Sequence, residues 1–145
     1  CAWGRGGAGG GAGDAGGGEA LSCGAGGVWP GGWKHGLFND AWPRIGNLGG
    51  VLRSEGEPSL FHPGDAYDGE PGQIDILALP LSAPWAASRD TVAFAQRIAP
   101  RFSVPIHDVL LSSIGRQLYL SQVQSFGPEG MEVRDLADGV AVDFS

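Results

Sequence analysis

The feature that most constrains the fold is a nearly continuous apolar run at residues 74–81, Ile-Asp-Ile-Leu-Ala-Leu-Pro-Leu. A strand that is buried on both faces of a parallel sheet has this kind of sequence, so we expect a central strand here. Ser88 can cap a helix that runs to about residue 99 and ends before Pro100, and residues 102–106 read as the next strand. This strand–helix–strand order predicts a βαβ unit with parallel strands.

Shorter elements are expected on both sides of this unit. A polar turn joins two short strands into a hairpin ahead of it, and a second helix and a pair of strands that turn at Asp138-Gly139 follow it. The predicted bounds are residues 48–53 and 59–61 for the first two strands, 110–123 for the helix, and 131–133 and 140–144 for the last two strands. The sequence therefore predicts an α/β fold with a mixed sheet.

The beginning of the chain has a different composition, because 16 of the 27 glycines fall in the first 36 residues. Residues 1–27 lack any apolar period and cannot bury enough surface to offset the entropy of ordering, so they are expected to be disordered. The same composition is typical of GC-rich DNA read in a wrong frame, which leaves open whether this segment is natural coding sequence. Residues 28–50 are richer in aromatic residues and predict an ordered but irregular loop, so the expected domain covers residues 28–145.

Charge and cysteine content narrow the function classes. A net charge of −7, a pI near 4.7 and the lack of a Lys/Arg cluster argue against binding to a nucleic-acid backbone. No run of about 18 apolar residues is present, so no membrane span is expected. The two cysteines, Cys1 and Cys23, form neither a disulfide framework nor a CxxC metal site, which favours a cytoplasmic protein. A cysteine at position 1 has two explanations. A truncated reading frame is favoured over lipidation of Cys1 in a processed lipoprotein.

Candidate metal ligands follow two of the predicted strands. Asp65 ends Phe-His-Pro-Gly-Asp at residues 61–65, and His107 lies in Val-Pro-Ile-His-Asp at residues 104–108. The carboxyl ends of parallel strands meet at one edge of a sheet, so these side chains could converge there. With His35 they offer the three ligands that a catalytic divalent metal needs, and Gly64 allows a sharp turn before Asp65.

These motifs, together with Asn-Leu-Gly at residues 47–49 and the apolar run at residues 74–81, occur in an order that resembles the metallo-β-lactamase superfamily, in particular its ascorbate-6-phosphate-lactonase-like branch. The resemblance covers residues 33–144. It implies the C-terminal half of a four-layer αβ/βα sandwich and a metal-dependent hydrolase whose metal-bound hydroxide attacks an ester, lactone, amide or phosphodiester of a small-molecule substrate.

The same resemblance implies metal-ligand roles for three residues. It also implies that other metal ligands of the family are missing from this sequence. His35 resembles the family's middle histidine, Asp65 the aspartate that bridges two metals, and His107 the last histidine, with one or two Zn²⁺ or Mn²⁺ ions bound in a complete site. The family's His-x-His-x-Asp-His motif is not in this sequence. The resemblance therefore implies a fragment that binds metal weakly and does not turn over alone, and it identifies no catalytic residue.

Three further residues have two interpretations each. His62 and Asp108 flank the predicted ligands and could orient them, although roles as turn and helix-cap residues are favoured. Trp85 could line a substrate cleft or could cover the end of the sheet. The rival to the hydrolase hypothesis is a non-catalytic α/β domain whose exposed sheet face binds a protein partner, with a second copy of itself as one candidate. For the hydrolase, a missing N-terminal half is the further candidate partner.

Overall fold

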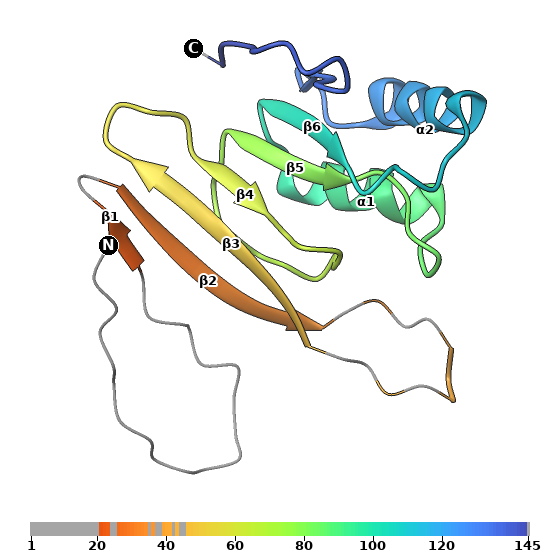
Figure 1. Ribbon diagram of the computed structural model, residues 1–145, viewed down its shortest axis with the longest axis horizontal. Helices are drawn as coiled ribbons and strands as arrows, with labels where there is room; N and C mark the ends of the chain where they lie inside the picture. The colour runs from red at the N-terminus through yellow and green to blue at the C-terminus, as the bar shows by residue number, and fades with distance from the viewer. Residues whose placement is uncertain are drawn as a thin grey trace.

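A computed structural model describes residues 21–23, 26–34, 36, 39–41, 43 and 46–144. Its strands form one sheet in which they follow one another in chain order (Figure 1). The strands are β1 (Leu21–Cys23), β2 (Gly26–Lys34), β3 (Gly46–Ser54), β4 (Leu60–His62), β5 (Ile76–Pro80), β6 (Phe102–Ile106) and β7 (Glu132–Val133). Neighbouring strands are antiparallel from β1 to β4 and parallel from β4 to β7.

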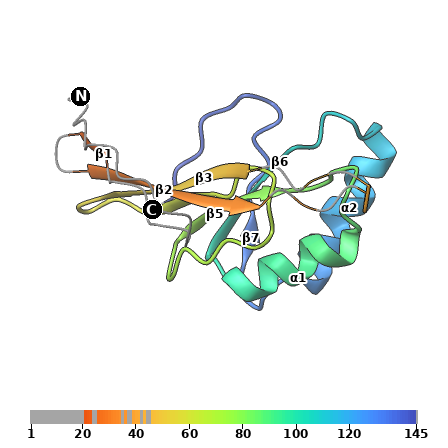
Figure 2. The same cartoon turned by 90° about the horizontal axis from the view of Figure 1, so that it is seen from below.

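Two helices, α1 (Ser88–Ile98) and α2 (Ser113–Phe126), pack against each other. Figure 2 shows them on the same side of the sheet. β5, α1 and β6 form the expected βαβ unit with parallel strands, so the predicted mixed α/β fold is confirmed at this level. Among the residues in the structure, no helix is long and apolar enough to cross a membrane.

The core lies between β5 and α1. All five residues of β5 are buried, as the apolar run predicted. Leu77 and Leu79 are fully buried and belong to the same cluster as Phe61 of β4 and Phe94 of α1, whose rings meet edge to face with centroids 6.4 Å apart. Each such side chain contributes about 1.5–3 kcal/mol by leaving water, so this cluster holds β4 and β5 against α1.

The expected hairpin is also present. β3 and β4 pair antiparallel, with Val51 opposite Phe61, and the turn between them contains Gly56 at φ 76°. A positive φ favours glycine because it has no Cβ to clash with the backbone. β4 then runs into the segment that carries Asp65.

The helix boundaries differ from the predicted ones by a few residues. The N-cap of α1 is Ala87 and not Ser88, because the Asp90 carboxylate accepts the Ala87 N–H at 2.9 Å. α2 starts three residues later than predicted, at Ser113, because residues 108–111 form a turn of their own. The Leu111 N–H donates to the Asp108 carbonyl at 3.0 Å, and the Ser112 hydroxyl then caps the helix.

The prediction of an irregular loop at residues 28–50 was wrong at both ends of that range. β2 and β3 pair along nine residues each, from Gly26 opposite Ser54 to Lys34 opposite Gly46. Glycine weakens the strand signal and Pro30 interrupts it. Within the described residues β1 pairs only with residues 26–28, so Pro30 lies beyond that pairing, where a strand edge tolerates proline. Within the segment predicted to be disordered, residues 21–23 and 26–27 form strands, and residues 1–20 lie outside the described chain.

The predicted strand at residues 140–144 is absent, although Asp138-Gly139 does form a turn with Gly139 at φ 72°. β7 pairs in parallel with β6, and residues 140–144 form no strand beside it. Phe144 packs edge to face on Phe102, with ring centroids 5.4 Å apart. The segment therefore contacts β6 through this half-buried ring and not through the backbone hydrogen bonds that the alternating sequence predicted.

Candidate metal centre

The carboxyl ends of β4, β5 and β6 lie at one edge of the sheet, because the three strands are parallel and adjacent. β4 ends at His62 and leads to Asp65, whereas β6 ends at Ile106 and leads to His107. The structure therefore places Asp65 and His107 at the same edge, on the two sides of β5. This is the position at which open α/β sheets assemble binding sites.

The turn before Asp65 is built around Gly64, which has φ 69°. A Cβ at Gly64 would lie 2.2 Å from the side-chain oxygen of Asn47, so no larger residue fits without a shift. Asn47 Nδ2 donates to the Pro63 carbonyl at 2.6 Å, and its Oδ1 accepts the Asp65 N–H at 3.1 Å. Gly64 therefore turns the chain as predicted, and Asn47, to which the sequence analysis gave no role, holds both sides of the turn.

The imidazole of His107 is oriented by the backbone after β5. Its Nδ1 lies 2.8 Å from the carbonyl oxygen of Ser82. A carbonyl can only accept a hydrogen bond, so Nδ1 carries the proton in this contact and the lone pair of the neutral ring is on Nε2. Metal-bound histidines in proteins usually show this arrangement, in which the second nitrogen donates to a carbonyl or a carboxylate.

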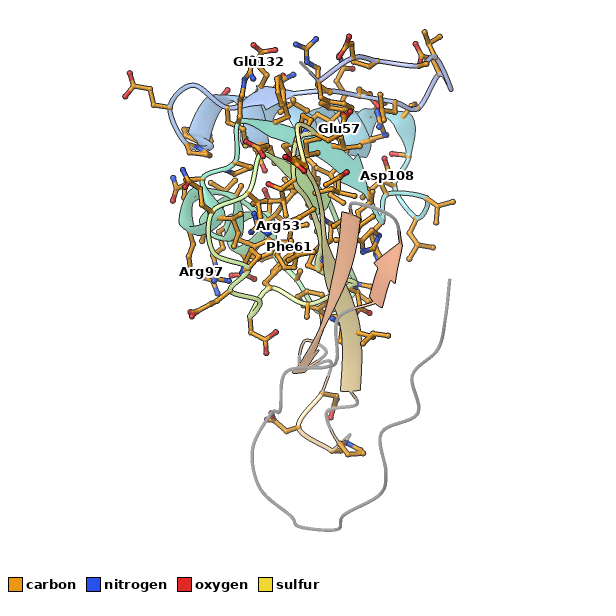
Figure 3. All side chains as sticks on the ribbon, turned by 90° about the vertical axis from the view of Figure 1, so that its left-hand side faces the viewer. Arg53, Glu57, Phe61, Arg97, Asp108 and Glu132 are labelled. Atoms are coloured by element: carbon orange, nitrogen blue, oxygen red, sulfur yellow. The ribbon has the colours of Figure 1, made fainter. Side chains whose placement is uncertain are left out.

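The two residues that flank the predicted ligands make local contacts. His62 Nδ1 accepts the Gly64 N–H at 3.1 Å and so supports the same turn as Asn47. Asp108 Oδ2 accepts from Nε of Arg116 at 2.6 Å. The N-cap of α2 is Ser112, so Asp108 does not have the helix-cap role that was favoured for it. Figure 3 labels Asp108 in the segment that follows β6, well away from Arg97 on α1.

An aromatic wall is formed by Tyr67, which follows Asp65 by two residues, together with Trp85 and Phe94. The half-buried Trp85 meets Tyr67 edge to face with ring centroids 4.8 Å apart, and Tyr67 stacks on Phe94. The Tyr67 hydroxyl contacts the Pro80 carbonyl and the Thr91 hydroxyl, each at 2.7 Å. Burial raises the pKa of Tyr67 to about 12 despite the hydrogen bond with Thr91. Trp85 therefore packs against Tyr67, and its two interpretations, as the lining of a substrate cleft and as a cover for the end of the sheet, both stay predictions.

His35 lies outside the described residues. Its neighbour Gly36 is described, and a Cβ at Gly36 would lie 2.2 Å from the Trp85 ring. The backbone at residue 36 is therefore in close contact with the aromatic wall of this sheet edge, and glycine is what permits the approach.

The donor set can be compared with what a divalent metal requires. Within the part of the chain that the structure describes, no group of three or more His, Cys, Asp or Glu side chains is arranged to hold a metal ion. Asp65 and His107 have the right donor chemistry, but a catalytic site needs at least three protein ligands. These two residues alone do not make a complete site.

A wide surface pocket of about 1090 Å³ lies at the opposite, amino-terminal edge of the parallel strands. Its lining comes from the β3–β4 turn, the start of β5, Arg101 and residues 141–144, and it contains no histidine. It is therefore separate from the candidate metal centre.

No known protein-family profile matches this sequence. The chain is 30% identical over 111 residues to Protein Rv0786c of Mycobacterium tuberculosis (strain ATCC 25618 / H37Rv), a match that covers 76% of this chain and 51% of that protein. Its structure is similar to the crystal structure of "Putative metal-dependent hydrolase" from Parabacteroides distasonis ATCC 8503, with a TM-score of 0.51, 21% identity, and coverage of 74% of this chain and 50% of that chain. The chain thus spans about half the length of both proteins, and the structural match shows a shared fold.

Proposed function

We propose that this chain is part of a metal-dependent hydrolase of the metallo-β-lactamase superfamily and that His35, Asp65 and His107 contribute ligands to its metal centre. The observation that carries the proposal is the contact between His107 Nδ1 and the Ser82 carbonyl. It leaves the lone pair of the neutral ring on Nε2, at the edge of the sheet that also carries Asp65. The name of the Parabacteroides protein agrees with this chemistry.

The proposed reaction is hydrolysis of an ester, lactone, amide or phosphodiester in a small molecule. A bound Zn²⁺ or Mn²⁺ ion would supply an activated water and would stabilise the developing oxyanion. The chain's own residues bind and orient: Asn47 and Gly64 fix the Asp65 turn, and Ser82 fixes the His107 ring. The His-x-His-x-Asp-His motif is absent, so the proposed site takes its remaining ligands from outside this sequence.

The metal centre can be tested by thermal unfolding of the full chain after treatment with EDTA. A ligand that binds only the native state at 100 times its Kd adds about 2.7 kcal/mol, which is roughly 5–10 °C in Tm for a chain of this size. Zn²⁺ or Mn²⁺ should raise the Tm, and Asp65→Ala should remove that rise. Asp68→Ala, which changes an exposed carboxylate in the same loop, is the matched control. A metal response that Asp65→Ala leaves intact would take Asp65 out of the site.

Hydrolysis should be measured on the same proteins with 4-nitrophenyl acetate and bis(4-nitrophenyl) phosphate. Because the ligand set is incomplete, turnover by the chain alone is expected to be slow, dependent on added metal, and absent from Asp65→Ala. Turnover that survives EDTA would contradict a metal-dependent reaction.

A second candidate function is self-association through the sheet face that points away from the helices. Leu48 and Leu52 of β3 alternate with the core residue Val51 and lie on that face, where they are 74% and 42% exposed. Exposed apolar side chains on a sheet face favour a protein partner, and a second copy of this chain is the occupant we propose. Sedimentation velocity should then give a dimer that Leu48→Glu dissociates and Leu118→Glu on α2 does not. A monomeric wild-type chain would rule out this function.

A further inference from the structure

The guanidinium of Arg116 joins three segments that are separate in the chain. Its Nε donates to Asp108 Oδ2 at 2.6 Å, and its two terminal nitrogens donate to the two carboxylate oxygens of Asp135, each at 2.7 Å. Asp108 directly follows His107, Arg116 is in the first turn of α2, and Asp135 follows β7. The contact with Asp135 is bidentate, which fixes geometry as well as charge.

This network is partly buried. The Arg116 and Asp108 side chains are 22% and 25% exposed, whereas the exposed pair of Arg89 and Asp90 has values of 88% and 44%. An exposed ion pair between long side chains contributes little free energy, because ordering the side chains costs entropy and water screens the charges. Loss of Arg116 would leave the Asp108 carboxylate half buried without this partner, so the segment that it belongs to would have to rearrange.

The residue next to Asp108 has an unusual backbone conformation. His107 has φ 58°, and Ala99 is the other non-glycine residue with positive φ in the described chain. Ala99 ends α1, where a left-handed residue is common, but His107 ends no helix. A side chain other than glycine stays in this region only where its surroundings hold it. The contact with Ser82 holds the ring of His107, and Arg116 holds the next residue.

The far end of the network is tied to β6. The Arg134 N–H donates to the Ser103 carbonyl at 2.8 Å, and the Ala137 N–H donates to the Asp135 carboxylate at 3.1 Å. Asp135 is therefore held in place beside the strand that leads to His107. Only the planar fork of arginine can bond Asp108 and both oxygens of Asp135 at once, since lysine presents a single nitrogen.

From these contacts we propose that Arg116, acting through Asp108, is a positioning residue that keeps the His107 ring against Ser82 in its Nδ1–H form. In this form Nε2 is available to a divalent cation, and that part of the inference rests on the proposed metal centre. The ring form itself can be measured without metal.

The first measurement is long-range ¹H–¹⁵N NMR of the full chain labelled with ¹⁵N-histidine, at pH 8. His107→Gln identifies the His107 signals. Wild type should show the Nδ1–H form, Arg116→Lys should show a mixture with the Nε2–H form, and Arg89→Lys, the matched control, should resemble wild type. An unchanged Nδ1–H form in Arg116→Lys would overturn the proposal.

If Arg116→Lys does not fold, Asp108→Asn provides the same test, because it removes the charge that accepts from Arg116 Nε and leaves the bidentate contact between Arg116 and Asp135. Titration with Co²⁺, followed by its visible absorption, then separates the two proposals. Affinity about tenfold weaker than wild type in either variant supports both. A changed His107 ring form in a chain that binds no Co²⁺ supports the role of Arg116 and contradicts the metal centre. Equal Co²⁺ affinity in wild type and in a variant whose ring form has changed supports the role of Arg116 and removes His107 from the metal centre.

Discussion

The side-chain oxygen of Asn47 accepts the backbone N–H of Asp65 at 3.1 Å, while the amide nitrogen of the same side chain donates to the Pro63 carbonyl at 2.6 Å. Asn47 lies near the start of β3, so one side chain connects the hairpin to the turn that presents a predicted metal ligand. The position of Asp65 therefore depends on β3 as well as on its own strand.

Replacing Asn47 should loosen this turn. Asn47→Ala removes two hydrogen bonds and is expected to lower the free energy of unfolding by about 1–2 kcal/mol, measured in urea. The Tm rise on adding Zn²⁺ should shrink as well. Asn39→Ala is the control, because Asn39 accepts a single N–H, from Ala41, in an exposed loop. Equal losses of stability in the two variants would contradict a stabilising role of the two Asn47 hydrogen bonds.

Glycine at position 64 should be required for two separate reasons. Alanine there must adopt φ 69° and would place its Cβ 2.2 Å from Asn47, whereas Gly72 has φ 73° with open space around it. Gly72→Ala should therefore cost only the backbone strain, about 1–2 kcal/mol. Gly64→Ala should cost at least about 1 kcal/mol more in the same urea measurement, because the clash adds to the strain. Similar values for both variants would mean that Asn47 moves aside freely.

The Tyr67 hydroxyl should stabilise the site loop against α1 and β5. Tyr67→Phe leaves the Pro80 carbonyl and the Thr91 hydroxyl without their shared partner, at an expected cost of about 1–3 kcal/mol. Tyr119→Phe on α2 controls for the loss of a tyrosine hydroxyl at another partly buried position. Chemical unfolding at pH 7 measures both. A cost for Tyr67→Phe no greater than that for Tyr119→Phe would contradict this role.

The same hydroxyl predicts a loss of stability at alkaline pH. Burial raises the pKa of Tyr67 from 10.0 to about 12, so the folded state keeps a proton that the unfolded chain releases. This contribution is fully present below pH 10 and is lost as the pH rises through about 12, amounting to roughly 2–3 kcal/mol. The free energy of unfolding, measured from pH 9 to 12, should fall less steeply with pH in Tyr67→Phe than in wild type. Parallel curves would show that other groups cause the alkaline loss.

Elements whose signals are local could be predicted from the sequence. The apolar run predicted β5, Pro100 predicted the end of α1, and Gly64 before Asp65 predicted the turn. β2 was missed because its glycines and Pro30 carry no strand signal, and its pairing with β3 supplies the order instead. A strand of this kind is defined by its partner and not by its own residues.

The supporting residues of the candidate site were not predictable in the same way. Asn47 contacts residues 16 and 18 positions away, and Arg116 contacts residues 8 and 19 positions away. Asparagine near the start of a strand and arginine in a helix are ordinary choices, so neither position stands out in one sequence. Ligand types follow from chemistry, whereas the residues that hold them follow from the fold.

Acid should weaken the junction between β4 and β5. The Ser59 hydroxyl and backbone N–H both donate to Oδ2 of Asp75, at 2.7 Å and 2.8 Å, and these bonds hold the pKa of the Asp75 carboxyl below its ordinary value of 3.8. A depressed pKa stabilises the folded state above the unfolded value, and this contribution is lost as the pH falls through the folded value, below about pH 4. The Tm of wild type should therefore drop more steeply than that of Asp75→Asn between pH 5 and pH 3. Asp40→Asn, which removes a charge from an exposed loop, should follow the wild-type curve, because the carboxyl of Asp75 and not the total charge of the chain causes the difference.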